Sequence, residues 1–148
     1  MPINRDKTLV IVDDSDDEYD IMVRAIKRVG DIHNPIVRCA SGDDILDYLN
    51  GRGAYAPPNK PDRPGMIVLD LNMPGTDGRA VLKQVKSEPT LKDIPIVVMT
   101  NSSNQDDIGL CYQLGANTYF VKPMEWSEFL EIMRSIRDYW LARAAFPA

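Results

Sequence analysis

Polar side chains that could carry out phosphate chemistry follow four of the apolar runs in this sequence. Asp13 and Asp14 follow the first run, Asp70 follows the third, Thr100 ends the fourth and Lys122 ends the fifth. Three carboxylates at one place repel one another unless a cation lies among them. Oxygen ligands of this kind favour Mg²⁺, which completes its coordination with water and phosphate oxygens. A metal ion, a lysine and a hydroxyl around a carboxylate indicate phosphoryl transfer with the carboxylate as nucleophile.

Each of these residues taken alone has a simpler interpretation. An aspartate at a strand end usually caps a helix or forms a turn, and a Lys-Pro pair usually lies in a loop. A threonine at that position is a common strand residue. The combination carries the inference, because capping alone does not explain five such residues at the ends of four runs.

The apolar runs are the strands expected to position these side chains. Most are continuously apolar, which is typical of parallel strands covered by helices on both faces. The five runs span residues 8–13, 35–40, 66–70, 94–100 and 117–122. Amphipathic stretches between them predict helices over 16–29, after the N-caps Ser41, Asp77 and Asn104, and from Glu125 to about Ala145. This alternation predicts an α/β fold with an open, doubly wound parallel sheet, which binds ligands at the carboxyl ends of its strands.

Composition narrows the class of protein. The chain has 148 residues, of which 44% are hydrophobic and 26% charged, as in a globular domain. The 17 basic and 22 acidic residues give a net charge of −5, which disfavours nucleic acid as the main partner. No apolar stretch approaches the roughly 18 residues of a membrane span, and no signal peptide is recognised. We therefore expect a cytoplasmic protein without a membrane partner.

The counts of cysteine and histidine exclude other kinds of catalytic site. Cys39 and Cys111 cannot form a zinc cage or a disulfide framework, and both are expected to be buried in the core. His33 is the only histidine, and its loop-like surroundings do not suit a catalytic triad. The stretch 51–65 contains four prolines and is expected to be a surface loop.

Several motifs together resemble the receiver domain of response regulators in two-component signalling. They are VDDS, the stretch D-L-N-M-P-G-x-D-G, the threonine of the fourth strand and Y-x-x-K-P, and the match spans about residues 8–137. The resemblance implies a flavodoxin-like (βα)5 fold with strand order 2-1-3-4-5. It also implies a single receiver domain over 1–148 that accepts a phosphoryl group from a sensor histidine kinase. Such a protein is a signalling protein and not an enzyme with a separate substrate.

The resemblance assigns the metal and phosphate sites residue by residue. Asp70 is the expected phosphoacceptor. Mg²⁺ is expected to be bound directly by Asp14 and Asp70, together with the backbone carbonyl of Asn72. Asp13 is expected to contribute through a water molecule.

The same resemblance assigns the residues that respond to phosphorylation. Thr100 is expected to bond a phosphoryl oxygen, and Lys122 is expected to pair with Asp70 or with its phosphate. Tyr119 matches the switch aromatic, which turns inward when Thr100 moves toward the phosphate. The Lys122–Pro123 bond is expected to be a cis peptide that holds the lysine in place.

One departure from the family pattern and two other function classes stay open. Asn101 stands where the family usually has a small residue, which affects access by small phosphodonors and the lifetime of the aspartyl phosphate.

One alternative function is a Mg²⁺-dependent phosphohydrolase, although Asn72 stands where such enzymes typically carry a second acid. The other is a receiver-like binding module that is never phosphorylated, against which the complete set of acidic residues, lysine and threonine argues.

The C-terminal part predicts how the protein signals and assembles. Residues 125–148 are expected to form one extended helix and a tail, with no output motif, so we expect signalling by contact with an unknown downstream protein. The proline-rich insertion and the long last helix resemble the small regulators that serve bacterial phytochromes, which makes a bacteriophytochrome the expected kinase. A second apolar row on the helix predicts a homodimer. Its expected interface consists of Ile132, Ile136, Tyr139, Trp140 and Phe146.

Overall fold

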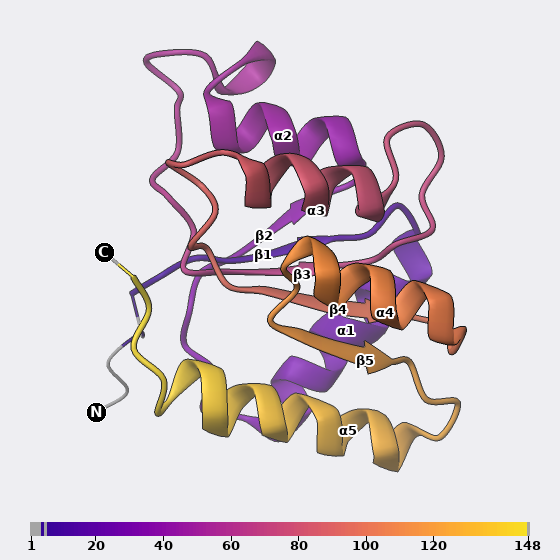
Figure 1. The fold of residues 1–148 in the computed structure, drawn as a ribbon. Coiled ribbons are helices and arrows are strands. Elements are labelled where there is room, and N and C mark those ends of the chain that lie inside the picture. The colour runs from indigo at the N-terminus through magenta and orange to yellow at the C-terminus, as the bar shows by residue number, and fades with distance from the viewer. Residues whose placement is uncertain (1–3, 5, 148) are drawn as a thin grey trace.

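The computed structural model describes residue 4 and residues 6–147, and a five-stranded parallel sheet in the order β2-β1-β3-β4-β5 forms its centre. The strands are β1 (Leu9–Val12), β2 (Ile36–Cys39), β3 (Met66–Leu69), β4 (Ile96–Thr100) and β5 (Thr118–Val121). In the parallel register, Leu9 of β1 lies between Ile36 of β2 and Met66 of β3. The predicted α/β class, the five strands and their order are confirmed (Figure 1).

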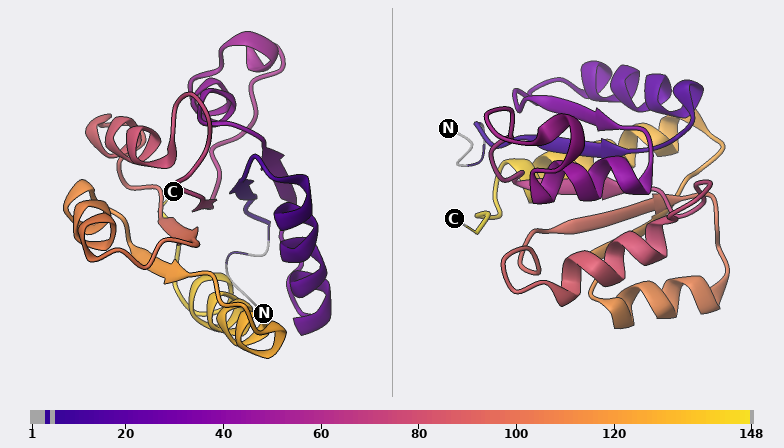
Figure 2. Two further views of the ribbon diagram at one scale, coloured as in Figure 1. Left: turned by 90° about the vertical axis from the view of Figure 1, so that its right-hand side faces the viewer. Right: turned by 90° about the horizontal axis from the view of Figure 1, so that it is seen from above.

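Helices cover both faces of the sheet (Figure 2). They are α1 (Asp16–Val29), α2 (Gly42–Asn50), α3 (Gly78–Ser87), α4 (Gln105–Leu114) and α5 (Trp126–Ser135). Helices α1 and α5 pack on one face, and α2, α3 and α4 pack on the other. Alternate residues of β1 belong to the two hydrophobic clusters, with Val10 and Val12 in one and Leu9 and Ile11 in the other. A continuously apolar strand is required because both of its faces are buried.

Short polar side chains determine where the helices begin. Ser15, Ser41, Asp77 and Asn104 each accept a hydrogen bond from a backbone N–H in the first turn of α1, α2, α3 and α4. The three N-caps predicted from the sequence are among them and are confirmed. Since these helices begin close to the carboxyl ends of the strands, the caps also hold the loops that carry the polar residues.

The last helix is shorter than expected and changes its geometry before it ends. Helix α5 continues into a π-helical segment, η2 (Ile136–Leu141), after which the chain turns away. The expected unbroken helix over 125–145 is therefore wrong. A contact distant in sequence lies where the helix ends: the side-chain amide of Asn4 donates hydrogen bonds to the carbonyl groups of Trp140 and Ala144. The last carbonyl groups of a helix lack N–H partners from a following turn, and here the side chain of Asn4 supplies the donor instead.

The N-terminal and C-terminal segments meet at the amino edge of the sheet (Figure 1). Asn4 is buried, its carbonyl accepts a hydrogen bond from Asn34, and its side-chain oxygen accepts the backbone N–H of Phe146 at 3.1 Å. A Cβ atom on Gly65 would lie 2.5 Å from the Phe146 ring, so the glycine leaves room for the ring. Ile136 is fully buried inside the chain. Ile136 is thus occupied by intrachain packing, and its assignment to a dimer interface is wrong, whereas Phe146 is only partly buried and its assignment stays a prediction.

The cysteines and the proline-rich stretch agree with expectation. Cys39 and Cys111 are both buried, and burial raises the pKa of the Cys39 thiol to about 12, so this thiol is unreactive at neutral pH. The stretch 51–65 is a loop with one 3₁₀ turn, η1 (Gly53–Tyr55). Among the residues that the structure describes, no helix is long and apolar enough to cross a membrane.

Candidate functional site

Asp13, Asp70 and Lys122 lie one residue beyond the ends of three strands, at the carboxyl edge of the sheet. The hydrogen bonds of the sheet continue to them, because their backbone N–H groups donate to carbonyl groups of neighbouring strands at 3.1, 3.0 and 2.7 Å, respectively. Thr100 is the last residue of β4 itself. The sheet therefore fixes the backbone of four polar residues, and their side chains are held in place before any ligand arrives.

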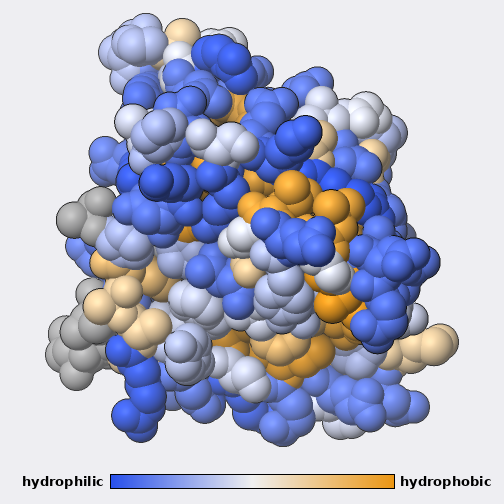
Figure 3. Space-filling view, viewed as in Figure 1, coloured by the Kyte–Doolittle hydropathy of each residue, from blue (hydrophilic) through white to orange (hydrophobic). Residues whose placement is uncertain are grey.

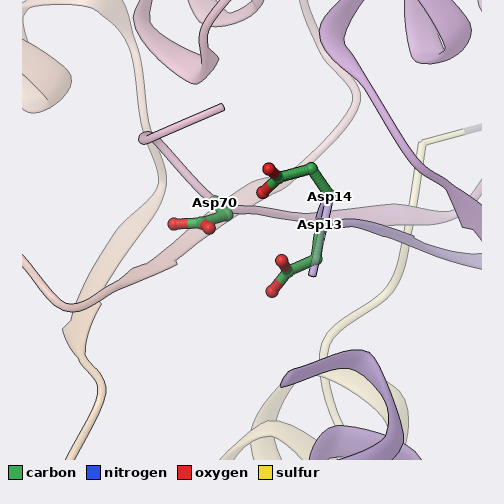
Figure 4. A group of neighbouring side chains, drawn as sticks. All are labelled: Asp13, Asp14 and Asp70. Carbon is green, nitrogen blue, oxygen red and sulfur yellow. The ribbon is translucent and has the colours of Figure 1, made fainter. Parts of the chain in front are cut away.

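The carboxylates of Asp13, Asp14 and Asp70 form the acidic part of the site, and Figure 4 shows them grouped around one space. One oxygen of each lies within 4.8 Å of the corresponding oxygens of the other two. Asp13 and Asp70 are buried, whereas Asp14 is exposed. The Asp13 carboxylate also accepts a hydrogen bond from the backbone N–H of Ser15 at 3.0 Å. Oxygen ligands grouped in this way fit a divalent cation such as Mg²⁺.

The buried ammonium group of Lys122 compensates part of this negative charge. The Lys122 side chain is 7% exposed, and its Nζ lies 3.1 Å from Asp13, 3.3 Å from Glu18 and 3.9 Å from Asp70. Burial by itself lowers the pKa of a lysine, but the carboxylates of Asp70, Asp13 and Glu18 outweigh it, so the pKa of Lys122 is raised. Lys122 is therefore a permanent cation beside the central carboxylate.

Asp70 is a carboxylate whose ionised form is only partly stabilised. Burial raises its pKa, and repulsion from Asp13 and Glu18 acts in the same direction, while the attraction of Lys122 opposes the shift without cancelling it. The backbone N–H of Leu71 donates to Asp70 Oδ1 at 2.8 Å. An incompletely solvated carboxylate next to a cation is well suited to act as a nucleophile.

The hydroxyl of Thr100 is a buried polar group that lacks a partner. Thr100 is fully buried, and its hydroxyl is near enough to Asp70 to help lower the pKa of that carboxyl, but among the described residues its Oγ1 makes no hydrogen bond of normal geometry. Buried hydroxyl groups are normally hydrogen-bonded, so an unpaired one at a polar edge indicates a missing acceptor. An oxygen of a phosphoryl group on Asp70 would supply that acceptor. The donor set at this edge thus fits a phosphorylated carboxylate.

Tyr119 in β5 is connected to the segment that follows Thr100. Its hydroxyl donates to the backbone carbonyl of Ser102 at 2.9 Å, and its ring packs against the hydrophobic cluster beneath α2, α3 and α4. The Ser102 hydroxyl donates to Asp107 at 2.6 Å, and Asp107 pairs with Arg79 at 2.8 Å. The ring is thus partly buried, and its hydroxyl is linked through Ser102 and Asp107 to Arg79 of α3. Its role as a switch stays a prediction.

Two backbone features were expected near the site: a cis peptide bond before Pro123 and a metal-binding carbonyl at Asn72. The Lys122–Pro123 bond is trans, so the expected cis peptide is wrong; among the described residues the cis bond joins Pro57 and Pro58. Trans is the more stable form of most X-Pro bonds, by about 0.5–1 kcal/mol. Lys122 is held by its hydrogen bond to β4 and by carboxylates, and no cis bond is needed for that. Asn72 is exposed in the loop after β3, and its role as a metal ligand stays a prediction.

Glu18 and Gly78 contribute to the site, although sequence reasoning assigned them no role. Glu18 contacts Lys122 and accepts a hydrogen bond from the side-chain amide of Asn101 at 3.0 Å. Gly78 begins α3, and a Cβ atom there would lie 2.2 Å from the carbonyl oxygen of Asp70. Gly78 ends the motif D-L-N-M-P-G-x-D-G, so its importance could have been recognised. The contact of Glu18 joins residues 83 positions apart and leaves no trace in the local pattern.

Comparison with known proteins groups the chain with one family. Residues 9–134 match the response regulator receiver domain. The response regulator Rcp1 of Synechocystis sp. is 34% identical over 145 residues, which cover 98% of this chain and 96% of Rcp1. The similarity thus extends over nearly the full length of both chains.

Solved structures agree with this grouping. The phosphorylated cyanobacterial phytochrome response regulator RcpA superimposes with a TM-score of 0.87 at 36% identity, covering 97% of this chain and 99% of RcpA. The Mn²⁺-bound form of Rcp1 has the same TM-score at 33% identity, covering 96% of this chain and 99% of Rcp1. Both relatives therefore share the fold over nearly their full length.

Proposed function

The chain belongs to the response-regulator receiver family, and from this premise we propose that it accepts a phosphoryl group from a sensor histidine kinase onto Asp70. Receiver domains take phosphoryl groups from histidine kinases. The observation that carries the assignment to Asp70 is its position among the other groups. It shares a space with two carboxylates, lies 3.9 Å from the Lys122 ammonium, and is at the same edge as the unpaired Thr100 hydroxyl.

The transfer exchanges one bond to phosphorus for another. An oxygen of Asp70 attacks the phosphorus of the kinase phosphohistidine, the new P–O bond forms, and the P–N bond breaks with its electron pair returning to the imidazole. Lys122 offsets negative charge on the transferred group, and the Thr100 hydroxyl donates a hydrogen bond to one of its oxygens. The buried position of both side chains excludes water from their side of the phosphoryl group.

The acidic group supports a divalent cation as cofactor, and we propose Mg²⁺. Receiver domains bind Mg²⁺ or Mn²⁺ at such a group, and the relative Rcp1 has been solved with Mn²⁺. Asp13, Asp14, Asp70 and the Asn72 carbonyl are the residues proposed to hold the ion. When bound, the ion would neutralise the carboxylates and the incoming phosphate oxygens.

We further propose a phytochrome-type sensor kinase as the phosphodonor. The similarity to RcpA, a phytochrome response regulator, supports this partner. The chain also covers nearly all of Rcp1 and of the RcpA chain, which supports a regulator of the same one-domain organisation. Such a regulator passes its signal on by contact with another protein.

Phosphotransfer from a purified, radiolabelled histidine kinase in the presence of Mg²⁺ tests the function. The wild-type protein is expected to acquire label that persists, and Asp70→Asn is expected to acquire none. Immediate release of inorganic phosphate without labelled protein would indicate a phosphohydrolase instead. No label from any phytochrome-type or other histidine kinase would indicate a binding module that is not phosphorylated.

We also propose a homodimer through the C-terminal helix, with an interface of fewer residues than the sequence predicted. Tyr139 is 62% exposed and forms an edge-to-face pair with Trp140, with 5.1 Å between the ring centroids. Both line a hollow beside β5, which is the edge strand of the sheet. Figure 3 shows hydrophobic residues gathered between β5 and α5 on this face. With Ile132, which is partly buried, these residues form the proposed interface.

Sedimentation at high micromolar concentration tests the dimer. The wild-type protein is expected to sediment as a dimer and Tyr139→Glu as a monomer. Ile21→Glu is the matched control, because Ile21 is 42% exposed on α1 and does not line the hollow that Tyr139 and Trp140 line. A monomeric wild-type protein, or an equal effect of both substitutions, contradicts the proposed interface.

A further inference from the structure

Glu18 is a fourth carboxylate at the phosphoryl site, on the solvent side of Lys122. Its Oε2 lies 3.3 Å from Lys122 Nζ, and its Oε1 accepts a hydrogen bond from Asn101 Nδ2 at 3.0 Å. The Glu18 side chain is 32% exposed, whereas those of Asp13, Asp70 and Lys122 are 2%, 8% and 7% exposed. Glu18 and Asn101 therefore connect α1 to the segment after β4, on the side of the site where Lys122 lies.

Glu18 competes with Asp70 for the same ammonium group. The Lys122 nitrogen is closer to Glu18, at 3.3 Å, than to Asp70, at 3.9 Å. A phosphoryl group on Asp70 needs this cation, so Lys122 has to give up part of its interaction with Glu18 as the phosphoryl group arrives. Glu18, Asn101 and Lys122 also line a surface cavity of about 220 Å³, so the Glu18 charge faces the space next to the site.

The negative charge of Glu18 affects small phosphodonors and protein phosphodonors differently. A small anionic donor meets the Glu18 carboxylate and has few other contacts with which to offset the repulsion. A kinase gains binding energy from contacts far from the reacting atoms, and that energy can offset the same repulsion. An electrostatic penalty beside the site thus selects for the protein donor.

We propose that Glu18, held in place by Asn101, is a specificity-determining residue that disfavours small anionic phosphodonors at Asp70. The inference rests on the proposed function, since it concerns the same phosphoacceptor. In the disfavoured reaction an Asp70 oxygen attacks the phosphorus of acetyl phosphate, the new P–O bond forms, and the bond between phosphorus and the acetyl oxygen breaks, so that acetate leaves with the electron pair.

Initial rates of Asp70 phosphorylation by acetyl phosphate, measured at saturating Mg²⁺, test the proposal. Glu18→Gln keeps the shape of the side chain and removes its charge, and it is expected to raise the rate by about threefold or more. Asn101→Ala frees Glu18 and is expected to raise the rate as well. Asp17→Asn is the matched control, because Asp17 is an exposed carboxylate on the same turn of α1 with no ion pair in the described part of the chain. Its rate is expected to equal that of the wild type.

Comparing two small donors of different charge separates electrostatic repulsion by Glu18 from a merely structural effect of the substitution. At neutral pH acetyl phosphate is mainly a dianion and phosphoramidate mainly carries a lower net charge. Glu18→Gln is therefore expected to accelerate the reaction of acetyl phosphate more than that of phosphoramidate, and by a larger factor than it changes the transfer from a kinase donor. A general loosening of the site would accelerate both small donors equally.

Two kinds of result overturn the inference. One is a Glu18→Gln variant that takes phosphate from acetyl phosphate no faster than the wild type, including the case in which neither reacts. The other is an Asp17→Asn variant that is accelerated as much as Glu18→Gln. Both can occur while a kinase still labels Asp70, and in that case the proposed function stands. Label from a kinase on Asp70→Asn contradicts the proposed function itself.

Discussion

The two edges of the sheet are built in opposite ways. At the carboxyl edge, carboxylates crowd around Lys122 and the buried hydroxyl of Thr100 has no partner in the described residues. At the amino edge, Asn4 is 3% exposed, and its amide group, side-chain oxygen and backbone carbonyl all form hydrogen bonds, with η2, Phe146 and Asn34 among the partners. The hydroxyl of Thr100 is left unpaired at the carboxyl edge, whereas the polar groups of Asn4 at the amino edge are all hydrogen-bonded.

This difference separates the residues that react from the residues that stabilise. Groups left without partners in the folded state are available to a ligand, but they cost stability while the ligand is absent. Groups that are fully hydrogen-bonded contribute to stability and offer nothing to a ligand. Substitutions at the carboxyl edge should therefore alter the chemistry, whereas those at the amino edge should alter stability alone.

The largest effect is expected from Asp14→Ala at the carboxyl edge. Asp14 is exposed, so its loss should leave the fold intact while removing a metal ligand. We expect kinase-driven phosphorylation to fall by about 100-fold or more, because the carboxylates and the incoming phosphate are no longer neutralised. Calorimetric Mg²⁺ titration and phosphotransfer rates check this. Mg²⁺ affinity equal to that of the wild type would show that Asp14 is not a ligand.

The next largest effect is expected from Lys122→Ala. Removing the ammonium leaves the buried carboxylates of Asp13 and Asp70 without their cation, which typically costs about 3–5 kcal/mol. We expect lower stability in urea without Mg²⁺, and a recovery on adding Mg²⁺ that exceeds the one in the wild type. Lys27→Ala, at the exposed end of α1, is the control. Equal stability of the two variants without metal would mean that Lys122 does not compensate the acidic group.

A smaller effect, confined to stability, is expected from Asn4→Ala at the amino edge. The substitution leaves the carbonyl groups of Trp140 and Ala144 and the N–H of Phe146 without their partner. This should cost about 1–3 kcal/mol, or about 2–4 °C in Tm per kcal/mol. Thermal unfolding measures the loss, with the exposed Asn59→Ala as control. A changed phosphotransfer rate at equal folded fraction would break the separation between the two edges.

The smallest effect is expected from Asp70→Asn on stability without metal. Burial raises the pKa of Asp70 above its ordinary value of 3.8, so the folded state binds the proton more tightly than the unfolded chain and ionised Asp70 destabilises the fold. The cost appears as pH rises through the unfolded pKa and is complete above the raised folded one. Asp70→Asn should thus be more stable than the wild type at pH 7, with the difference vanishing toward pH 3. Urea unfolding across pH checks this, and a variant less stable at pH 7 contradicts it.

The parts that the sequence predicted are those set by local pattern. The five strands follow from their apolar runs, and the caps Ser41, Asp77 and Asn104 act on the helix that directly follows each of them. The polar residues at the strand ends could be assigned because parallel strands bring their carboxyl ends to one edge.

Other features of the structure could not be predicted from the sequence, and some of them depend on contacts between distant segments. The last helix ends at a contact with Asn4, which is 136 positions away from Trp140. The burial of Ile136 is a different case: this residue lies three positions after the buried Met133 and seven after the buried Phe129, so helical spacing could have placed it on the buried face. The isomer of the bond before Pro123, which is trans, is also not set by the local sequence pattern alone.

The central claim is that Asp70 alone receives the phosphoryl group, and direct chemical mapping tests it. After phosphotransfer from a histidine kinase, borohydride reduction converts an aspartyl phosphate into homoserine, which peptide mass spectrometry locates. We predict homoserine at position 70 and unmodified aspartate at positions 13 and 14. Homoserine at either of those positions, or its absence from position 70 in protein that carries the label, would contradict the account.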